Sequence, residues 1–341
     1  MDVLIFLAWT LRVRILLVPV SYARCHSGDL HHTTPSLRWS WKGRCRSTSV
    51  LFLYIMQNMI DTHCHIHFRA FDADMQEVIN RTLEKGVKMI TIGTQTSTSK
   101  TGIEVAEANE GVWCTVGLHP SHTHRQTLHV DENESIETRA EEFDKDYYRE
   151  LIASSSKVVA IGEVGLDYFR LPELGAEDVI VSQKVNVNHA LELANELDLP
   201  VVLHVRDAHD DMQEILEQFT SSGRLKRRGV VHCFTGTLRE AVAYHDLGFY
   251  TSFTGIVTFK DKKNPSDITP LMAVAKDLPL EWMILETDAP YLAPSPHRGE
   301  RCEPWMVMSV AEKIAELKEV DVGEVERITD ENAKKLFNIE F

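Results

Sequence analysis

The sequence predicts an α/β protein that folds as a (β/α)8 barrel of the TIM type. Short β-prone runs alternate with stretches of helical spacing, the runs number eight, and the alternation continues from residue 57 to the end of the 341-residue chain. Strands that alternate with helices pair in parallel through right-handed crossovers. Eight such units close a barrel of about 250 residues. We therefore expect one barrel domain over residues 57–341.

Each expected strand is a short apolar run that ends near a polar residue. The expected strands are 57–62, 87–92, 112–118, 157–162, 200–204, 229–232, 248–252 and 282–286. The expected helices are 73–85, 100–109, 136–153, 178–197, 208–222, 237–246, 266–277, 303–318 and 322–337. An open doubly wound sheet is the alternative. It usually binds a nucleotide through a Gly-rich turn after the first strand, and no such turn follows the first run here.

Residues 1–56 differ from the rest of the chain. They hold seven basic and two acidic residues, whereas the whole chain has a formal net charge of −15. Arg12 and Arg14 interrupt their apolar opening run, and a transmembrane helix needs about 20 apolar residues. Three interpretations stay open: a targeting or signal peptide, a membrane anchor, and a mispredicted start just before Met56 or Met59. We favour the mispredicted start.

Charge and cysteine usage restrict the function classes. A net charge of −15 argues against a protein that coats nucleic acid through a broad basic face. It does not exclude an enzyme that meets phosphate groups through bound metal ions. The six cysteines are scattered without a CxxC spacing, which favours a reducing compartment. We expect a cytoplasmic protein with no stable protein partner, and no membrane association unless residues 1–56 belong to it.

The residues that bear chemistry stand at the carboxyl ends of the expected strands. In a barrel these ends form one rim, where active sites are built. His63 and His65 are two apart at the end of the first strand, so their side chains face the same way. The other candidates are Glu163 after the fourth strand, His204 and His232 at the ends of the fifth and sixth, and Asp288 just past the eighth.

Imidazole and carboxylate groups in one place suit Zn²⁺, Mn²⁺ or a similar divalent ion. Six ligands exceed what one tetrahedral ion takes, so we expect two ions about 3.5–4 Å apart. Asp288 and Glu163 are the expected catalytic carboxylates, and Asp288 is placed to accept a proton from the attacking water.

A histidine outside this set is more often a loop or core residue than a ligand. On that basis His67, and the loop histidines His122, His124 and His129, are left out of the metal site. Asp61 is expected to orient the histidines rather than to bind metal. Cys302 is not expected to be a nucleophile, because no base is marked beside it.

Six segments carry a resemblance to a known family. They are IDTHCH, VGLHP, IGEVGLDY, VVLHVRDA, VVHCFTG and ETDAPYLAP, within a stretch of about 280 residues that runs from Ile60 to the C-terminus. Together they resemble the TatD family of metal-dependent deoxyribonucleases, which belongs to the amidohydrolase-like barrels. One departure is Cys302 in HRGERCEP, where the family usually has asparagine. That substitution puts the role of the family asparagine in doubt.

The resemblance implies a role for each site residue. His63, His65, Glu163 and Asp288 correspond to one metal site, and Glu163, His204 and His232 to the second, with Glu163 bridging. His119 matches a family histidine near the substrate phosphate. Arg206 is expected to meet a phosphate as well, although a structural ion pair is the alternative.

The leading functional expectation is a hydrolase that cleaves phosphodiester bonds at single-stranded DNA ends, as a 3′-to-5′ exonuclease, with Mg²⁺, Mn²⁺ or Zn²⁺. An amide or lactone hydrolase of the wider superfamily is the alternative. A carboxylated lysine often bridges the metals in that branch, so the glutamate at position 163 favours the phosphoesterase. A binding protein with an unused site is a third hypothesis, and the six intact ligand positions argue against it.

Overall fold

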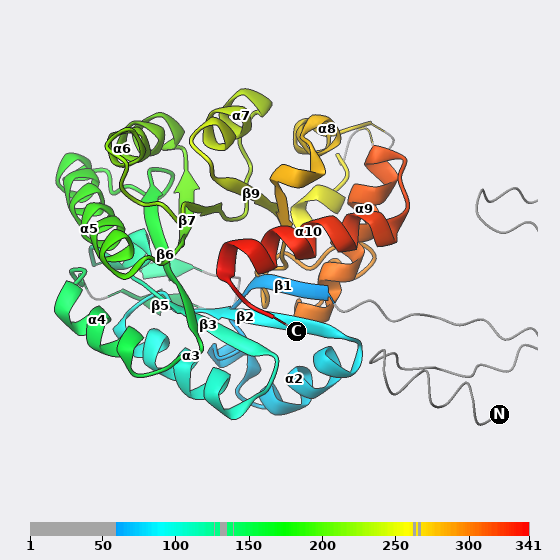
Figure 1. The fold of residues 1–341 in the computed structure, drawn as a ribbon, viewed down its shortest axis with the longest axis horizontal. Coiled ribbons are helices and arrows are strands. Elements are labelled where there is room, and N and C mark those ends of the chain that lie inside the picture. Colours follow the sequence, from blue (N-terminus) through cyan, green and yellow to red (C-terminus); the bar gives the residue numbers. More distant parts are fainter. Residues whose placement is uncertain are drawn as a thin grey trace, which may run out of the picture. The chain divides into compact units, whose positions relative to one another are not determined.

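A computed structural model describes residues 59–340 except 126, 130–134, 139, 262–263 and 265–266. The predictions for residues 1–56 lie outside these described residues. Eight parallel strands form one sheet in chain order, which confirms the predicted (β/α)8 barrel (Figure 1). They are β1 (Met59–Cys64), β2 (Val87–Ile92), β3 (Val112–Val116), β6 (Val158–Asp167), β7 (Val201–Arg206), β8 (Gly229–Val231), β9 (Tyr250–Phe253) and β10 (Met283–Leu285).

The barrel is closed where β1 meets the segment that follows β10. Cys64 and Ala289 form a parallel bridge. The amide of His65 donates to the carbonyl of Ala289 at 2.6 Å, and the amide of Asp288 donates to the carbonyl of His63 at 2.8 Å. These hydrogen bonds hold the two ends of the sheet together at the rim.

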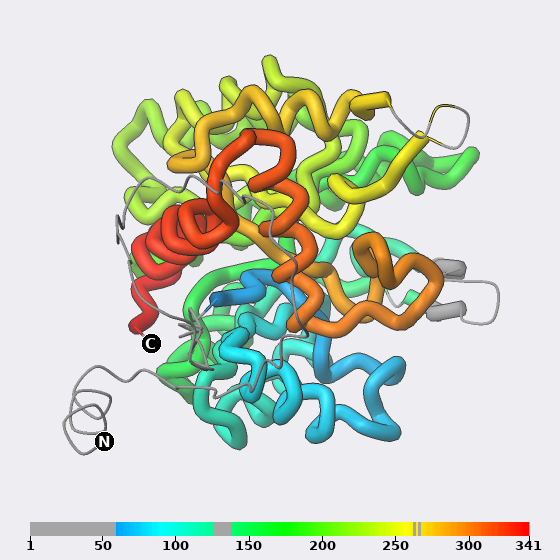
Figure 2. The backbone as a smooth tube through the Cα atoms, turned by 90° about the vertical axis from the view of Figure 1, so that its right-hand side faces the viewer, coloured from blue at the N-terminus to red at the C-terminus, as the bar shows by residue number. Residues whose placement is uncertain are grey.

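Helices surround the barrel in the order that the sequence predicts (Figures 1 and 2). They are α2 (Met75–Glu84), α3 (Thr96–Ala108), α4 (Lys145–Ala153), α5 (Ala176–Leu197), α6 (His209–Ser221), α7 (Leu238–Asp246), α8 (Pro270–Asp277), α9 (Val307–Lys318) and α10 (Val322–Phe337). Short 3₁₀ turns are η1 (Arg69–Phe71), η2 (Pro120–His122), η3 (Gly255–Thr258), η4 (Leu280–Trp282) and η5 (Pro304–Met306).

The predicted helix over 136–153 is wrong in its first half. Its opening residues pair instead as β5 (Ser135–Glu137) with β4 (Thr127–His129) in an antiparallel hairpin. The helix α4 begins only at Lys145, because the side chain of Asp144 accepts hydrogen bonds from the amides of Asp146 and Tyr147. A side chain that satisfies these first amides sets the start of a helix.

The fourth barrel strand is longer than predicted. It was expected to end at residue 162, but β6 continues to Asp167 because β7 pairs with it as far as Arg206. Gly165 allows this close approach. Its φ is +152°, and a Cβ there would lie 1.9 Å from the carbonyl oxygen of His204.

Helix α10 covers the amino-terminal end of the barrel (Figure 1). Its residues Ala333, Leu336 and Phe337 share one buried cluster with Ile60 and Ile284 from the strands. The side chains on this end are therefore packed away from solvent, which leaves the opposite rim for chemistry.

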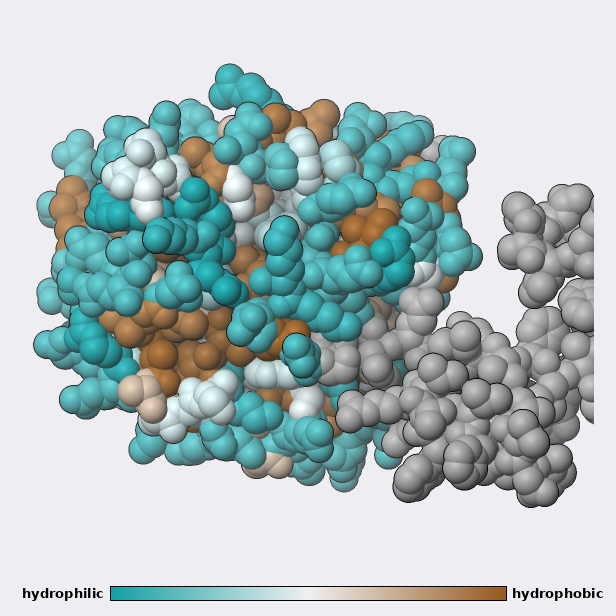
Figure 3. Space-filling model, viewed as in Figure 1, coloured by the Kyte–Doolittle hydropathy of each residue, from teal (hydrophilic) through white to brown (hydrophobic). Residues whose placement is uncertain are grey.

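The surface in the same view is mostly hydrophilic, as the net charge of −15 predicts, with smaller apolar areas (Figure 3). Within the part of the chain that the structure describes, every helix is too short or too polar to cross a membrane. A cytoplasmic location stays a prediction.

Asp330 joins α10 to the barrel, and its environment predicts a pH effect on stability. Its carboxylate accepts a hydrogen bond from the Ile60 amide at 3.1 Å. Burial raises the pKa of Asp330 from 3.8 to about 8, against the opposing hydrogen bond from Ile60 and the charge of Lys334. The folded chain therefore keeps this proton between about pH 4 and pH 8 while the unfolded chain releases it.

Protonated Asp330 therefore contributes fully to the free energy of unfolding below about pH 4, and this contribution is lost as the pH rises towards 8. Asp330→Asn stays neutral and can still accept the Ile60 hydrogen bond. We expect its free energy of unfolding, measured by urea denaturation, to exceed that of the wild type by more at pH 8 than at pH 5. The exposed Asp277→Asn variant controls for the loss of one negative charge. An equal difference at both pH values would contradict the prediction.

Candidate metal centre

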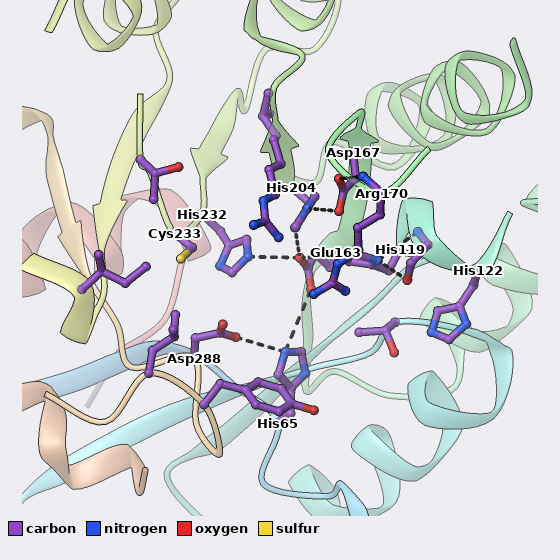
Figure 4. A pocket seen from close by; sticks show the side chains of 18 of the residues that line it. His65, His119, His122, Glu163, Asp167, Arg170, His204, His232, Cys233 and Asp288 are labelled. Atoms are coloured by element: carbon purple, nitrogen blue, oxygen red, sulfur yellow. Dashed lines mark hydrogen bonds and ion pairs between the residues drawn. The ribbon is translucent and has the colours of Figure 1, made fainter. Parts of the chain in front are cut away.

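Five of the six predicted ligands line one pocket at the carboxyl-terminal rim (Figure 4), and the sixth, His63, is fully buried beside them. The cavity has a volume of about 600 Å³. One ligand lies on each of β1, β6 and β7, one follows β1 and one follows β8 directly, and the last stands three residues past the end of β10. These are His63, His65, Glu163, His204, His232 and Asp288.

The first group of donor atoms surrounds the Nε2 atoms of His63 and His65, which lie 3.3 Å apart. Glu163 Oε2 is 3.6 Å from His63 Nε2, and Asp288 Oδ1 is 3.4 Å from His65 Nε2. Two donors of a tetrahedral zinc site with bonds of about 2.0–2.1 Å lie roughly 3.3 Å from each other. The spacing of this group therefore fits a single divalent ion.

The second group surrounds the other oxygen of Glu163. Glu163 Oε1 lies 2.8 Å from His204 Nδ1 and 3.0 Å from His232 Nε2. It also lies 3.4 Å from His119 Nε2. The two oxygens of one carboxylate thus face two separate sets of histidines. A carboxylate that bridges two cations needs this arrangement.

Hydrogen bonds orient two of the histidine rings towards the centre. His65 Nδ1 lies 3.0 Å from the carbonyl of Ile92, and His232 Nδ1 lies 3.2 Å from Glu286 Oε1. When Nδ1 donates to these oxygens, the lone pair of Nε2 points at the other ligands. Glu286 was not anticipated from the sequence, although it directly precedes Thr287 and Asp288 in the ETDAP segment.

The charges of the centre favour a cation. Burial alone would raise the pKa of Glu163, but the charges of His119 and His232 outweigh burial and hold that pKa well below its usual range. Burial likewise opposes a proton on His232, yet the carboxylates of Glu163 and Glu286 raise its pKa well above its usual value. These two shifts have the same cause, because the carboxylates of the centre favour a positive charge beside them. The donor set therefore suits divalent metal ions.

His119 is arranged to donate a hydrogen bond. Its Nδ1 accepts from the amide of Ser121 at 3.1 Å. When the ring is neutral, the proton therefore lies on Nε2, the atom that faces Glu163. A metal ligand needs a lone pair there, so this arrangement suits a donor to a phosphate oxygen better than a ligand.

Arg206 lines the pocket and stacks on Phe169, with its guanidinium carbon 3.6 Å from the ring centre. It forms no salt bridge with the described residues, so the structural ion pair that was the alternative is absent there. Asp61 accepts hydrogen bonds from the amides of His63 and Thr287. It positions the main chain of the rim, not a histidine ring.

Besides Glu286, Asp167 and the pocket position of His122 were not anticipated from the sequence. Asp167 lies at the end of β6 with Oδ2 3.3 Å from His204 Nε2, and its position four residues after Glu163 on one strand is the signal that could have found it. His122 was assigned to a solvated loop, but it is 8% exposed and lines the pocket. It is buried because η2 turns it inward, three residues after His119. His67 lies apart and bonds Thr91 Oγ1 at 2.7 Å.

Comparison with known proteins assigns the family. The TatD-related DNase family matches residues 60–338. The chain belongs to this family. A relative from Bacillus subtilis, the uncharacterized metal-dependent hydrolase YabD, is 38% identical over 282 residues, which are 82% of this chain and 99% of the relative. The TatD-related chain described here is thus a metal-dependent hydrolase.

Two further relatives support the TatD assignment. The 3′-5′ ssDNA/RNA exonuclease TatD of Pantoea ananatis is 32% identical over 289 residues, covering 82% of this chain and 100% of that protein. The crystal structure of YjjV, a TatD homologue from Escherichia coli, has a TM-score of 0.69 and 28% identity, covering 84% of this chain and 100% of that one.

Proposed function

We propose that this protein is a two-metal phosphodiesterase that cleaves DNA, acting on single-stranded 3′ ends. The observation that carries the proposal is the position of Glu163, whose Oε2 faces His63 and His65 while Oε1 faces His204 and His232. Pairs of metal ions held in this way are common in enzymes that cleave phosphodiesters. The printed name of the Pantoea relative, a single-stranded DNA and RNA exonuclease, supports the same substrate class.

Bound divalent ions would neutralise charge on the phosphate and lower the pKa of a water molecule. Residues of the chain would supply the proton acceptor and the hydrogen-bond donors to phosphate. Asp288 has a side chain that is 15% exposed, whereas the side chain of Glu163 is 4% exposed. Water therefore reaches Asp288 more readily, and Asp288 accepts the proton of the water that attacks phosphorus. His119 donates a hydrogen bond to an oxygen of the phosphate that is attacked, and Arg206 donates to a phosphate of the substrate.

An amide or lactone hydrolase is the competing function. In that branch a carboxylated lysine often bridges the metal ions. Here the bridging position is Glu163, and no lysine is among the described residues that line the pocket. The phosphoesterase is therefore the better match to this donor set.

The test is hydrolysis of single-stranded DNA labelled at its 5′ end. We expect a ladder of products that shorten from the 3′ end with Mg²⁺ or Mn²⁺, and no products with a chelator. His232→Ala is expected to lose this activity, while the matched control His189→Ala, on the outer helix α5, retains it. Hydrolysis of lactones or dipeptides by metal-loaded protein that leaves DNA intact would favour the competing function and overturn the proposal.

A further inference from the structure

Two arginine side chains line the pocket and bring positive charge to it. Arg170 follows β6, and Arg206 is the last residue of β7. Neither guanidinium forms a hydrogen bond or salt bridge with any residue that the structure describes, whereas Arg81 and Arg301 are both paired with carboxylates. Arg170 reaches into the pocket from above Glu163 in Figure 4. The charge of Arg170 helps to lower the pKa of Asp167, but it leaves the guanidinium N–H groups of Arg170 without an acceptor among the described residues. Two such guanidinium groups beside the candidate metal centre, in a protein of net charge −15, indicate a place for an anion.

Hydrogen bonds to the side chain of Asp167 hold the turn that carries Arg170. Asp167 Oδ1 accepts hydrogen bonds from the amides of Phe169 at 3.0 Å and Arg170 at 3.3 Å. The other oxygen of Asp167 faces His204, so one carboxylate connects the turn to a candidate metal ligand. The same turn presents Phe169, which is 59% exposed and supports Arg206 from one face. Stacking covers that face of the guanidinium and leaves its N–H edge available.

The arginines belong to the mouth of the pocket, not to its floor. Glu163 is 3% exposed, whereas Arg170 is exposed and Arg206 is partly exposed. A cavity of about 600 Å³ lies in the range of roughly 300–1,000 Å³ that buries a drug-sized ligand, so it holds more than the one phosphate that reacts. Phe68, Ile256 and Leu292 provide apolar lining for the remainder of such a ligand.

We propose that Arg170 and Arg206 form a second anion subsite that binds the phosphate group next to the one that is cleaved. The inference rests on the proposed function and adds to it the number of substrate phosphates that the pocket recognises. Guanidinium groups bind phosphate oxygens through paired, charge-assisted hydrogen bonds. A substrate with two phosphodiesters would therefore use the subsite, and a substrate with one would leave it empty.

The experiment compares the thymidine dinucleotide TpT, which has one phosphodiester, with the trinucleotide TpTpT, which has two. Initial rates would be measured with Mn²⁺ for the wild type, Arg170→Gln, Arg170→Lys and the control Arg327→Gln, which lies on α10 at the opposite end of the barrel. We expect the wild type to have a kcat/KM for TpTpT roughly 10-fold or more above that for TpT, because charge-assisted hydrogen bonds are lost in TpT.

Arg170→Gln is expected to lose most of this preference, Arg170→Lys to recover part of it, and Arg327→Gln to keep it. Equal wild-type values for the two substrates, or an equal fall for both in Arg170→Gln, would overturn the subsite and leave the proposed function standing. Cleavage of neither compound by metal-loaded wild type would overturn the proposed function, and the subsite with it.

Discussion

Glu163→Gln is expected to lower kcat for DNA hydrolysis by at least about 10³-fold, equivalent to about 4 kcal/mol in the activation free energy. Glutamine has the same size but carries no charge, and it offers one oxygen where glutamate offers two. Because both oxygens of Glu163 are in use, the variant cannot serve the two histidine groups equally. We expect bound metal, measured by elemental analysis, to fall from about two equivalents to one or fewer.

The matched control is Glu77→Gln on the exposed surface of α2. It removes the same charge from an exposed residue that does not line the pocket, and both kcat and metal content should match the wild type. A Glu163→Gln variant that retains two metal equivalents and at least a tenth of the wild-type rate would rule out a bridging role for Glu163.

Asp288→Asn is expected to lower kcat by about 10²–10⁴-fold, the usual contribution of a general base, with KM changed by less than about threefold. Asparagine keeps an oxygen that can face His63 and His65 but cannot accept the proton. The substitution suits the backbone, because Asp288 has a φ of +65° and asparagine tolerates this left-handed region. Steady-state kinetics on a labelled oligonucleotide would measure both constants.

The control for Asp288→Asn is Asp72→Asn, at the exposed end of η1. A large rise in KM with an unchanged kcat would assign Asp288 to substrate binding instead of proton transfer. Wild-type kinetics in both variants would remove Asp288 from the mechanism.

The sequence was sufficient for the barrel and for the positions of the candidate ligands because both follow from local patterns. Alternation of strands and helices predicts the fold, and the barrel then brings the ends of separate strands to one rim. His63 and His65 lie two apart on a strand, so their shared face was predictable from the pair alone. The structure brings the other four candidates together at this rim, as predicted: Glu163, His204, His232 and Asp288. Their role as ligands stays a proposal.

The features that the sequence did not reveal depend on pairing and packing between distant segments. The length of β6 is set by its pairing with β7, which brings Asp167 opposite Arg206. His122 is buried because η2 packs against the pocket, although its loop is rich in polar residues. Arg170 became a candidate for substrate binding only when the structure placed it in the pocket lining. Periodicity along one segment carries no information about such contacts.

The consequence of a single substitution, Cys302, was also not readable from the sequence. It stands where the family usually has asparagine, and the structure places it in the core with its amide bonded to the carbonyl of Pro290 at 3.0 Å. Burial raises the pKa of the Cys302 thiol far above its usual value, so the thiolate needed for nucleophilic attack does not form. Cys302 is a buried core residue and does not take part in the proposed chemistry.

The most direct test of the account is a crystal structure of the protein soaked with Mn²⁺, with anomalous scattering measured at the manganese edge. We expect two anomalous peaks about 3.5–4 Å apart, one among His63, His65 and Asp288 and the other beside His204 and His232, with Glu163 between them. A single peak, or peaks that leave Glu163 without a metal neighbour, would contradict the two-metal centre on which the proposed function depends.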